Sequence, residues 1–168
     1  ETIVDLLQKF NYYKQPAQLF YSEYDGYTIQ GAASVGLANS MSFPDIISEA
    51  IKYRTPFEYS KPTKNTGFIS IEVEQTLESR ATRDVKKVKS KINVFDLPSA
   101  EILSDHFRNL SNNLEYKTLY AFQNMIGDLA KSNGNSIPTI YENSIVTKLM
   151  KELIGANSIC MGIFTLCN

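Results

Sequence analysis

The sequence predicts a mixed fold of helices and strands, α/β or α+β, in a single domain. Residues 68–74 alternate apolar and polar side chains, which is the period of a strand with one solvated face. Residues 119–129 place large apolar side chains three and four positions apart, which is the period of a helix. The chain has 168 residues, 43% hydrophobic and 21% charged, so it can bury a sizeable core.

The first third of the chain predicts two strand-like segments and a helix. Residues 2–10 are apolar and predict a strand end or a short helix, and residues 27–30 alternate like an edge strand. A helix is expected to begin at Ser42, because Pro44 is tolerated in a first turn and Asp45 favours the positive helix end. Its core-facing stripe is Ile46, Ile47, Ala50 and Ile51, and Pro56 is expected to end it.

The middle of the chain predicts a long hairpin. Residues 68–74 and 91–95 are its two strands, and the polar stretch 76–90 is expected to connect them. Residues 96–101 then form a loop at the carboxyl end of the second strand, where open α/β sheets usually bind their ligands.

The last third predicts two helices and a strand. The first helix covers residues 119–129, and the second is capped by Asn143 or Ser144 and ends at Gly155. The apolar run 159–166 has the length of a final strand.

Composition excludes several classes of function. The chain has 17 Lys and Arg against 18 Asp and Glu, so its net charge of -1 gives no reason to expect nucleic acid or an anionic membrane. One histidine, His106, excludes a multi-histidine metal site, and no metal is expected. Cys160 and Cys167 are expected to be buried structural thiols in or beside the final strand. No apolar run approaches the roughly 20 residues of a membrane span.

Generic catalytic motifs are absent from the sequence. It contains no G-x-x-x-x-G-K-[ST], G-x-S-x-G, C-x-x-C or H-E-x-x-H. A basic cluster near the hairpin tip is either a docking site for an acidic surface or a solvated tip, and charged runs usually only solvate. Its members are Arg80, Arg83, Lys86, Lys87, Lys89 and Lys91.

Six segments, read in order, are similar to one known family. They are residues 1–7 (ETIVDLL), 69–75 (ISIEVEQ), 90–101 (SKINVFDLPSAE), 117–126 (KTLYAFQNMI), 141–150 (YENSIVTKLM) and 154–158 (IGANS). They resemble "NE-x-I-x-DLL", the strand after the first nucleotide switch, "SKLNLVDLAGSE", "KSLSALGNVI", "YRNSKLTRLL" and "LGGNS" of the kinesin motor domain. The resemblance implies a P-loop NTPase-type central mixed sheet flanked by helices. Residues 1–168 would be only its second half, with the P-loop half absent, so we expect a fragment.

The two nucleotide switches depart from the family pattern. Where the first switch reads "SSRSH", residues 62–66 read Pro-Thr-Lys-Asn-Thr, and the second switch has Pro98 and Ser99 where the family has glycine. Proline removes a donor and stiffens the turn, and phosphoryl transfer depends on positioned donors. We therefore expect no catalytic residue and no ATP hydrolysis, with no cofactor unless ATP and Mg²⁺ bind a complete motor. The degenerate switch positions are Thr63, Lys64, Asp96, Ser99 and Glu101.

The resemblance also implies a surface that faces the microtubule. Here the arginine of "YRNSKLT" is Glu142 and its lysine is Ile145, so this surface is less basic than the family's. The residues expected on it are Lys117, Asn124, Asn143, Thr147, Lys148 and Lys151.

Three hypotheses follow from the sequence. The first is a non-catalytic kinesin-like domain, similar to non-catalytic kinesin-like subunits, that binds microtubules or a catalytic motor partner. The second is a divergent ATP-dependent motor whose P-loop lies upstream of Glu1. The third is a cytoskeletal scaffold that has left the microtubule and docks through Tyr12, Tyr13, Phe20 and Tyr21, although core packing and strand-edge filling are the favoured explanation of such aromatic residues.

The first hypothesis implies tubulin as partner and a cytoplasmic place on microtubules or the spindle, with neither nucleic acid nor membrane bound. It also implies a coiled-coil partner, although the chain itself gives no direct sign of a coiled coil.

Overall fold

The computed structural model describes residues 2–7, 16–37, 42–53, 65–78, 85–98, 117–132, 138–154 and 158–163. In these ranges two strands, a helix, a second pair of strands and two further helices follow one another, and the sequence predicts this order for all but β1. The strands form two separate antiparallel sheets of two strands each, rather than one central sheet. The elements are β1 (Gln18–Ser22), β2 (Gly26–Gln30), α1 (Ser42–Tyr53), β3 (Gly67–Glu78), β4 (Val85–Asp96), α3 (Lys117–Lys131), the 3₁₀ turn η4 (Pro138–Tyr141) and α4 (Ile145–Met150).

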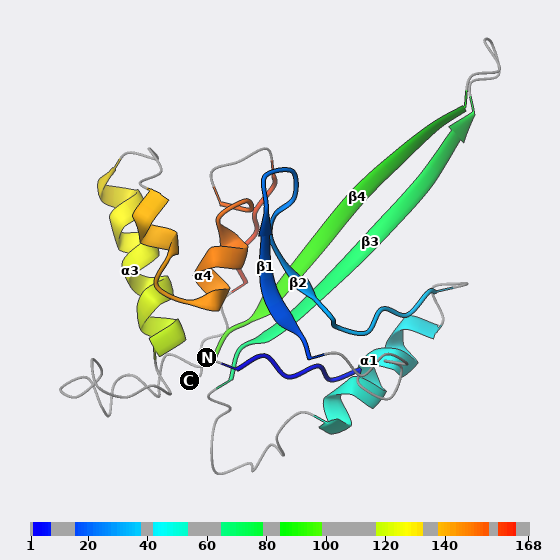
Figure 1. Cartoon of the computed structure of the whole chain (residues 1–168), viewed down its shortest axis with the longest axis horizontal. Helices are drawn as coiled ribbons and strands as arrows, with labels where there is room; N and C mark the ends of the chain where they lie inside the picture. Colours follow the sequence, from blue (N-terminus) through cyan, green and yellow to red (C-terminus); the bar gives the residue numbers. More distant parts are fainter. Residues whose placement is uncertain are drawn as a thin grey trace.

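The β3–β4 hairpin is a long arm that extends away from helices α3 and α4 (Figure 1). Both strands have 12 residues and stay in register from Gly67 opposite Asp96 to Glu78 opposite Val85. The predicted hairpin is confirmed, but residues 76–78 and 85–90 belong to its strands and not to a connection. Cross-strand charge pairs accompany this polar part of the ladder: Glu74 lies 3.6 Å from Lys87 and 3.5 Å from Lys89.

The two faces of this hairpin differ in chemistry because side chains alternate along each strand. One face carries Phe68 opposite Phe95 near the base, with ring centroids 4.8 Å apart, and charged residues further out. Phe95 and Leu97 pack against the core between the helices. The opposite face is mostly aliphatic and includes the exposed Ile92 and Val94.

The shorter hairpin, β1–β2, was only half predicted. Strand β2 agrees with the predicted edge strand at 27–30, whereas β1 was not expected, because Leu19, Phe20 and Tyr21 give no apolar–polar alternation. The backbone N–H of Asp25 donates to Ser22 Oγ at 2.9 Å in the turn. Gly26 closes this turn with φ at 66°, a left-handed conformation that favours glycine.

Helix α1 begins at Ser42 as predicted and ends, among the described residues, at Tyr53; Pro56 lies outside them. Lys52 and Glu49 form an ion pair of 3.0 Å on it. Helix α1 has no buried residue, and Ile51 of its predicted core-facing stripe is exposed. Of the helices that the structure describes, none is long and apolar enough to cross a membrane.

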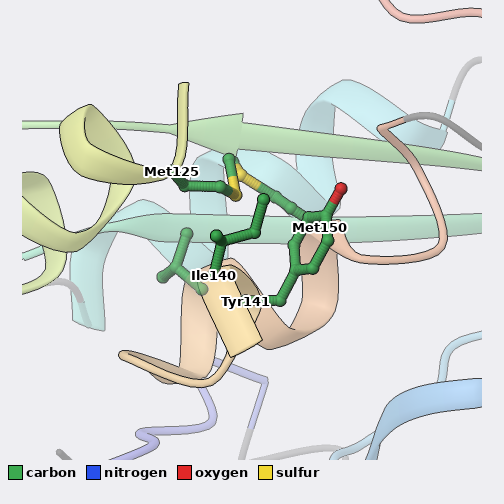
Figure 2. Packing of buried hydrophobic residues seen from close by; sticks show 5 residues of the cluster. Met125, Ile140, Tyr141 and Met150 are labelled. Atoms are coloured by element: carbon green, nitrogen blue, oxygen red, sulfur yellow. The ribbon is translucent and has the colours of Figure 1, made fainter. Parts of the chain in front are cut away.

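The core lies between α3, η4 and α4. Met125 of α3 is completely buried against Ile140, Tyr141 and Met150, as Figure 2 shows. The Tyr141 hydroxyl donates to the carbonyl oxygen of Ile154 at 3.1 Å, which ties the end of the chain segment after α4 to this core. The predicted helix at 119–129 is confirmed, and the second helix is shorter than predicted, since α4 ends at Met150.

Two predictions for the ends of the chain are wrong. Residues 2–7 form neither strand nor helix; instead the Asp5 carboxylate accepts from the backbone N–H of Leu7 at 2.9 Å and of Ala33 at 2.8 Å. Residues 158–163 form no strand, and Cys160 among them is exposed and not buried. An apolar run becomes a strand only beside a partner strand, and this run pairs with no strand of the described ranges. Cys167 and His106 lie outside them.

Candidate partner-binding surface at the β1–β2 hairpin and helix α4

The β1–β2 hairpin meets helix α4 at a cluster of charged and aromatic side chains. The Tyr27 hydroxyl donates to both carboxylate oxygens of Glu142, at 3.1 Å and 3.2 Å. Glu142 Oε2 also lies 3.2 Å from Lys148 Nζ. We call these residues, together with Lys151 and Tyr21, the Tyr27 cluster.

The two lysines of the Tyr27 cluster lie against aromatic rings. Lys148 Nζ is 5.8 Å from the centre of the Tyr27 ring, and Lys151 Nζ is 5.8 Å from the same ring and 5.9 Å from that of Tyr21. Tyr21 and Tyr27 are opposite each other on β1 and β2, with ring centroids 4.9 Å apart. An ammonium group within about 6 Å of a ring face is attracted to its electrons, so the hairpin orients both lysines.

Local sequence explains why α4 presents these lysines together. Ser144 caps the helix, because its Oγ accepts from the Thr147 N–H and Thr147 Oγ1 accepts from the Ser144 N–H, both at 3.0 Å. Lys148 and Lys151 are three positions apart, so they lie on the same side of this turn of chain. Gly26 allows close approach on the other side of the contact, since a β-carbon there would press on the Glu152 side chain.

The electrostatics of the cluster depend on Glu142. Burial raises the pKa of Tyr27 above its ordinary value, and the hydrogen bond to Glu142 and its negative charge raise it further. Lys148 opposes this effect. Burial, and then the charge of Glu152, likewise raise the pKa of Tyr141 beneath the cluster. Both phenols are therefore neutral donors at pH 7.

Most of the described residues that were expected to face a microtubule lie on the surface of α3, of α4 or of the turns on either side of α4. Lys148 and Lys151 meet in the Tyr27 cluster, and Asn143 is exposed in the turn before α4. Lys117, exposed at the start of α3, and the half-buried Asn124 are seven positions apart, so they share one side of that helix.

Thr147 corrects the predicted set of surface residues. Its side chain is completely buried, with Oγ1 donating to the carbonyl oxygen of Tyr141 at 2.8 Å. The hydroxyl makes its hydrogen bonds inside the helix cap, so the Thr147 side chain is not accessible to a partner.

The predicted switch residues are only partly described. Asp96 is the last, exposed residue of β4. Thr63, Lys64, Ser99 and Glu101 lie outside the described residues. The structure therefore assembles no nucleotide switch from residues that it describes.

Two members of the cluster were not predicted to act together. Tyr27 was noted only as part of a strand, and Glu142 only as a departure from a basic motif. The sequence signal for this contact is Glu142 itself, which stands where the family motif has arginine. A carboxylate at this position can accept a hydrogen bond and can pair with a nearby lysine. Their contact spans 115 positions, which no local pattern encodes.

Part of the basic cluster on the long hairpin is neutralised within the described residues. Lys87 and Lys89 lie near Glu74, and Lys91 lies 3.5 Å from Glu72. All these groups are largely exposed, so each pair contributes little to stability. Arg80 and Arg83 lie outside the described ranges. This arrangement favours the interpretation of a solvated arm.

The described elements have the arrangement of part of a kinesin motor fold. The chain is similar to the solved structure described as "KIF14[391-755] - ADP in complex with a microtubule", with a TM-score of 0.70 and 23% sequence identity. The match covers 94% of this chain and 47% of that chain, so this chain spans about half the length of the structure that it matches. No family model and no curated protein sequence matches the chain. The likeness confirms the predicted fold class as a mixed α/β part of a kinesin motor fold, although the described strands form two short sheets and not one central sheet.

Proposed function

We propose that this chain is a kinesin-like domain that binds the acidic surface of microtubules. The observation that carries the proposal is the similarity of 94% of the chain to a motor domain solved on a microtubule. The Tyr27 cluster supports it, because Lys148 and Lys151 are preoriented by aromatic rings on one surface. Preoriented cations suit an acidic partner, since less side-chain entropy is lost on binding.

We further propose that the domain binds without hydrolysing ATP. Pro98 follows β4 at the position of the second switch and is buried, so a rigid residue without an N–H directly precedes Ser99, which stands where the family has its donor glycine. Transfer of a phosphoryl group needs such positioned donors. A catalytic motor subunit as a second partner, and a cytoplasmic location on microtubules, are parts of this proposal that follow from the resemblance.

Co-sedimentation with microtubules tests the proposal. The chain is mixed with stabilised microtubules at two salt concentrations, with and without ATP, and the pelleted fraction is measured. We expect pelleting that falls steeply with salt, because screening weakens contacts between exposed charges, and that ignores ATP. Release by ATP would overturn the non-catalytic part, and no pelleting at low salt would overturn microtubule binding.

A further inference from the structure

We propose that Glu142 is an intramolecular competitor for Lys148 that lowers the affinity of this surface for acidic protein partners. The inference rests on the proposed function, because it concerns the same surface. The inference adds a residue that sets how tightly partners bind. The Glu142 carboxylate already pairs with Lys148, which is one of the cations that an acidic partner would contact.

Two contacts orient the Glu142 carboxylate toward Lys148. Both of its oxygens accept from the Tyr27 hydroxyl, at 3.1 Å and 3.2 Å, and one of them lies 3.2 Å from Lys148 Nζ. Tyr27 belongs to β2 and Glu142 to the turn before α4, so strand and helix together fix the carboxylate. A carboxylate held from two sides loses little further freedom when it pairs with the lysine.

The pair is accessible enough to exchange partners. The side chains of Lys148 and Glu142 are 29% and 43% exposed, so both reach solvent. Ion pairs of this exposure are weak, and an incoming carboxylate can replace one member. An acidic partner must therefore either displace Glu142 or meet a neutralised Lys148, and both routes cost affinity.

Lys151 differs from Lys148 in the same cluster. It lies over the rings of Tyr21 and Tyr27, and a ring does not cancel its charge. Lys148 is thus the cation whose contribution Glu142 controls.

Glu142→Gln tests this inference with little change of shape. Glutamine keeps an oxygen that accepts from Tyr27 and removes the negative charge. We expect the affinity for microtubules at low salt to rise roughly two- to fivefold, as expected for an exposed pair of this strength, and the salt dependence to become steeper. In a Lys148→Gln background, the same Glu142→Gln change should have no such effect.

Two controls give the inference a clear failure. Glu74→Gln removes the same charge from β3, where Glu74 also lies near two lysines. Strand β3 belongs to the hairpin arm that extends away from α4 (Figure 1). An equal gain in microtubule affinity from Glu74→Gln would show that the effect comes from the net charge of the protein alone. An equal gain from Glu142→Gln in the Lys148→Gln background would show direct repulsion of the partner by Glu142. Either result overturns competition for Lys148.

A second probe separates this inference from the proposed function. Binding of a soluble polyglutamate peptide is measured by fluorescence anisotropy for the wild type and the same variants. A gain for Glu142→Gln toward polyglutamate, without any pelleting on microtubules, would support the inference and overturn the proposed function. Pelleting of the wild type with no gain for Glu142→Gln in either assay would overturn the inference alone.

Discussion

The hydroxyl of Tyr27 donates to the carboxylate of Glu142 across 115 positions of sequence. This contact joins the β1–β2 hairpin to the turn that starts α4, and Gly26 lies against Glu152 beside it. The hairpin and the helix are far apart in the sequence, at Gln18–Gln30 and Ile145–Met150. Their contact turns two unremarkable sequence segments into one surface that carries Lys148 and Lys151.

The titration of Tyr27 should depend on Glu142. Because burial and the nearby carboxylate raise the pKa of Tyr27 above the ordinary 10.0, Tyr27 should ionise at a higher pH than an ordinary tyrosine. Subtracting the ultraviolet pH titration of Tyr27→Phe from that of the wild type isolates this phenol among ten tyrosines. Glu142→Gln should move the isolated titration to lower pH.

The same shift predicts a change of stability with pH. The proton is held more tightly in the folded state, so the resulting stabilisation is present below pH 10 and is lost as the pH rises through the folded pKa. Above pH 10 the free energy of unfolding of the wild type should therefore fall more steeply than that of Tyr27→Phe. Parallel curves would contradict a raised pKa.

Gly26→Ala should destabilise the protein. The left-handed φ of 66° disfavours a β-carbon, and that carbon would also press on the Glu152 side chain. We expect a loss of about 1–3 kcal/mol in the free energy of unfolding, measured by urea denaturation. Gly36→Ala is the matched control, because nothing lies within 4 Å of its new β-carbon, and it should change stability by less than about 0.5 kcal/mol.

Thr147→Val should cost more than the loss of an ordinary surface hydroxyl. Its Oγ1 donates to Tyr141 O at 2.8 Å and accepts from Ser144 N at 3.0 Å inside the core, and valine leaves both groups unsatisfied. We expect a loss of about 3 kcal/mol. Thr76→Val, on the exposed part of β3, should stay within about 0.5 kcal/mol of the wild type. Equal effects of the two substitutions would mean that the cap is unimportant.

The sequence predicted best the elements whose residues report their own period. Leu119, Phe122 and Met125 identify α3, because a helix buries every third or fourth side chain. The alternation at 68–74 identifies the inner part of β3 in the same way. The outer part of the hairpin was missed, because residues 76–78 and 85–90 are mostly polar or charged and look like loop composition in one dimension, whereas their pairing across the ladder is visible only in the structure.

Features that depend on particular side-chain contacts or on a partner strand, rather than on the period of apolar residues, could not be predicted. Thr147 resembles a surface residue of a basic motif, but its burial depends on the cap with Ser144 and on contact with Tyr141. The apolar run at 159–163 resembles a strand, but the described ranges give it no strand to pair with. The resemblance to a family supplied what local patterns could not, namely the expectation that Lys117 and Lys148, which belong to different helices, face the same partner.

Gly127→Ala should stabilise the protein. Gly127 lies inside helix α3, and nothing lies within 4 Å of a β-carbon added there. Alanine costs less backbone entropy in a helix, so we expect a gain of about 1 kcal/mol in the free energy of unfolding. The opposite change in the same helix, at the exposed Ala130, is the control: Ala130→Gly should lose a similar amount. A loss of stability in Gly127→Ala would mean that this helix face packs more tightly than the structure indicates.

Replacing Lys117, Lys148 and Lys151 by alanine should weaken microtubule binding. The triple variant removes three cations from α3, α4 and the turn after α4, and two of them, Lys148 and Lys151, are the lysines that the aromatic rings orient. We expect the dissociation constant at low salt to rise about tenfold, or about 1.4 kcal/mol, and the salt dependence to flatten. Lys86→Ala, Lys87→Ala and Lys89→Ala, combined on β4, remove the same charge from the long hairpin and should have a much smaller effect. Equal losses in the two triple variants would point to net charge, and unchanged pelleting of the first would place the interface on another face of the molecule.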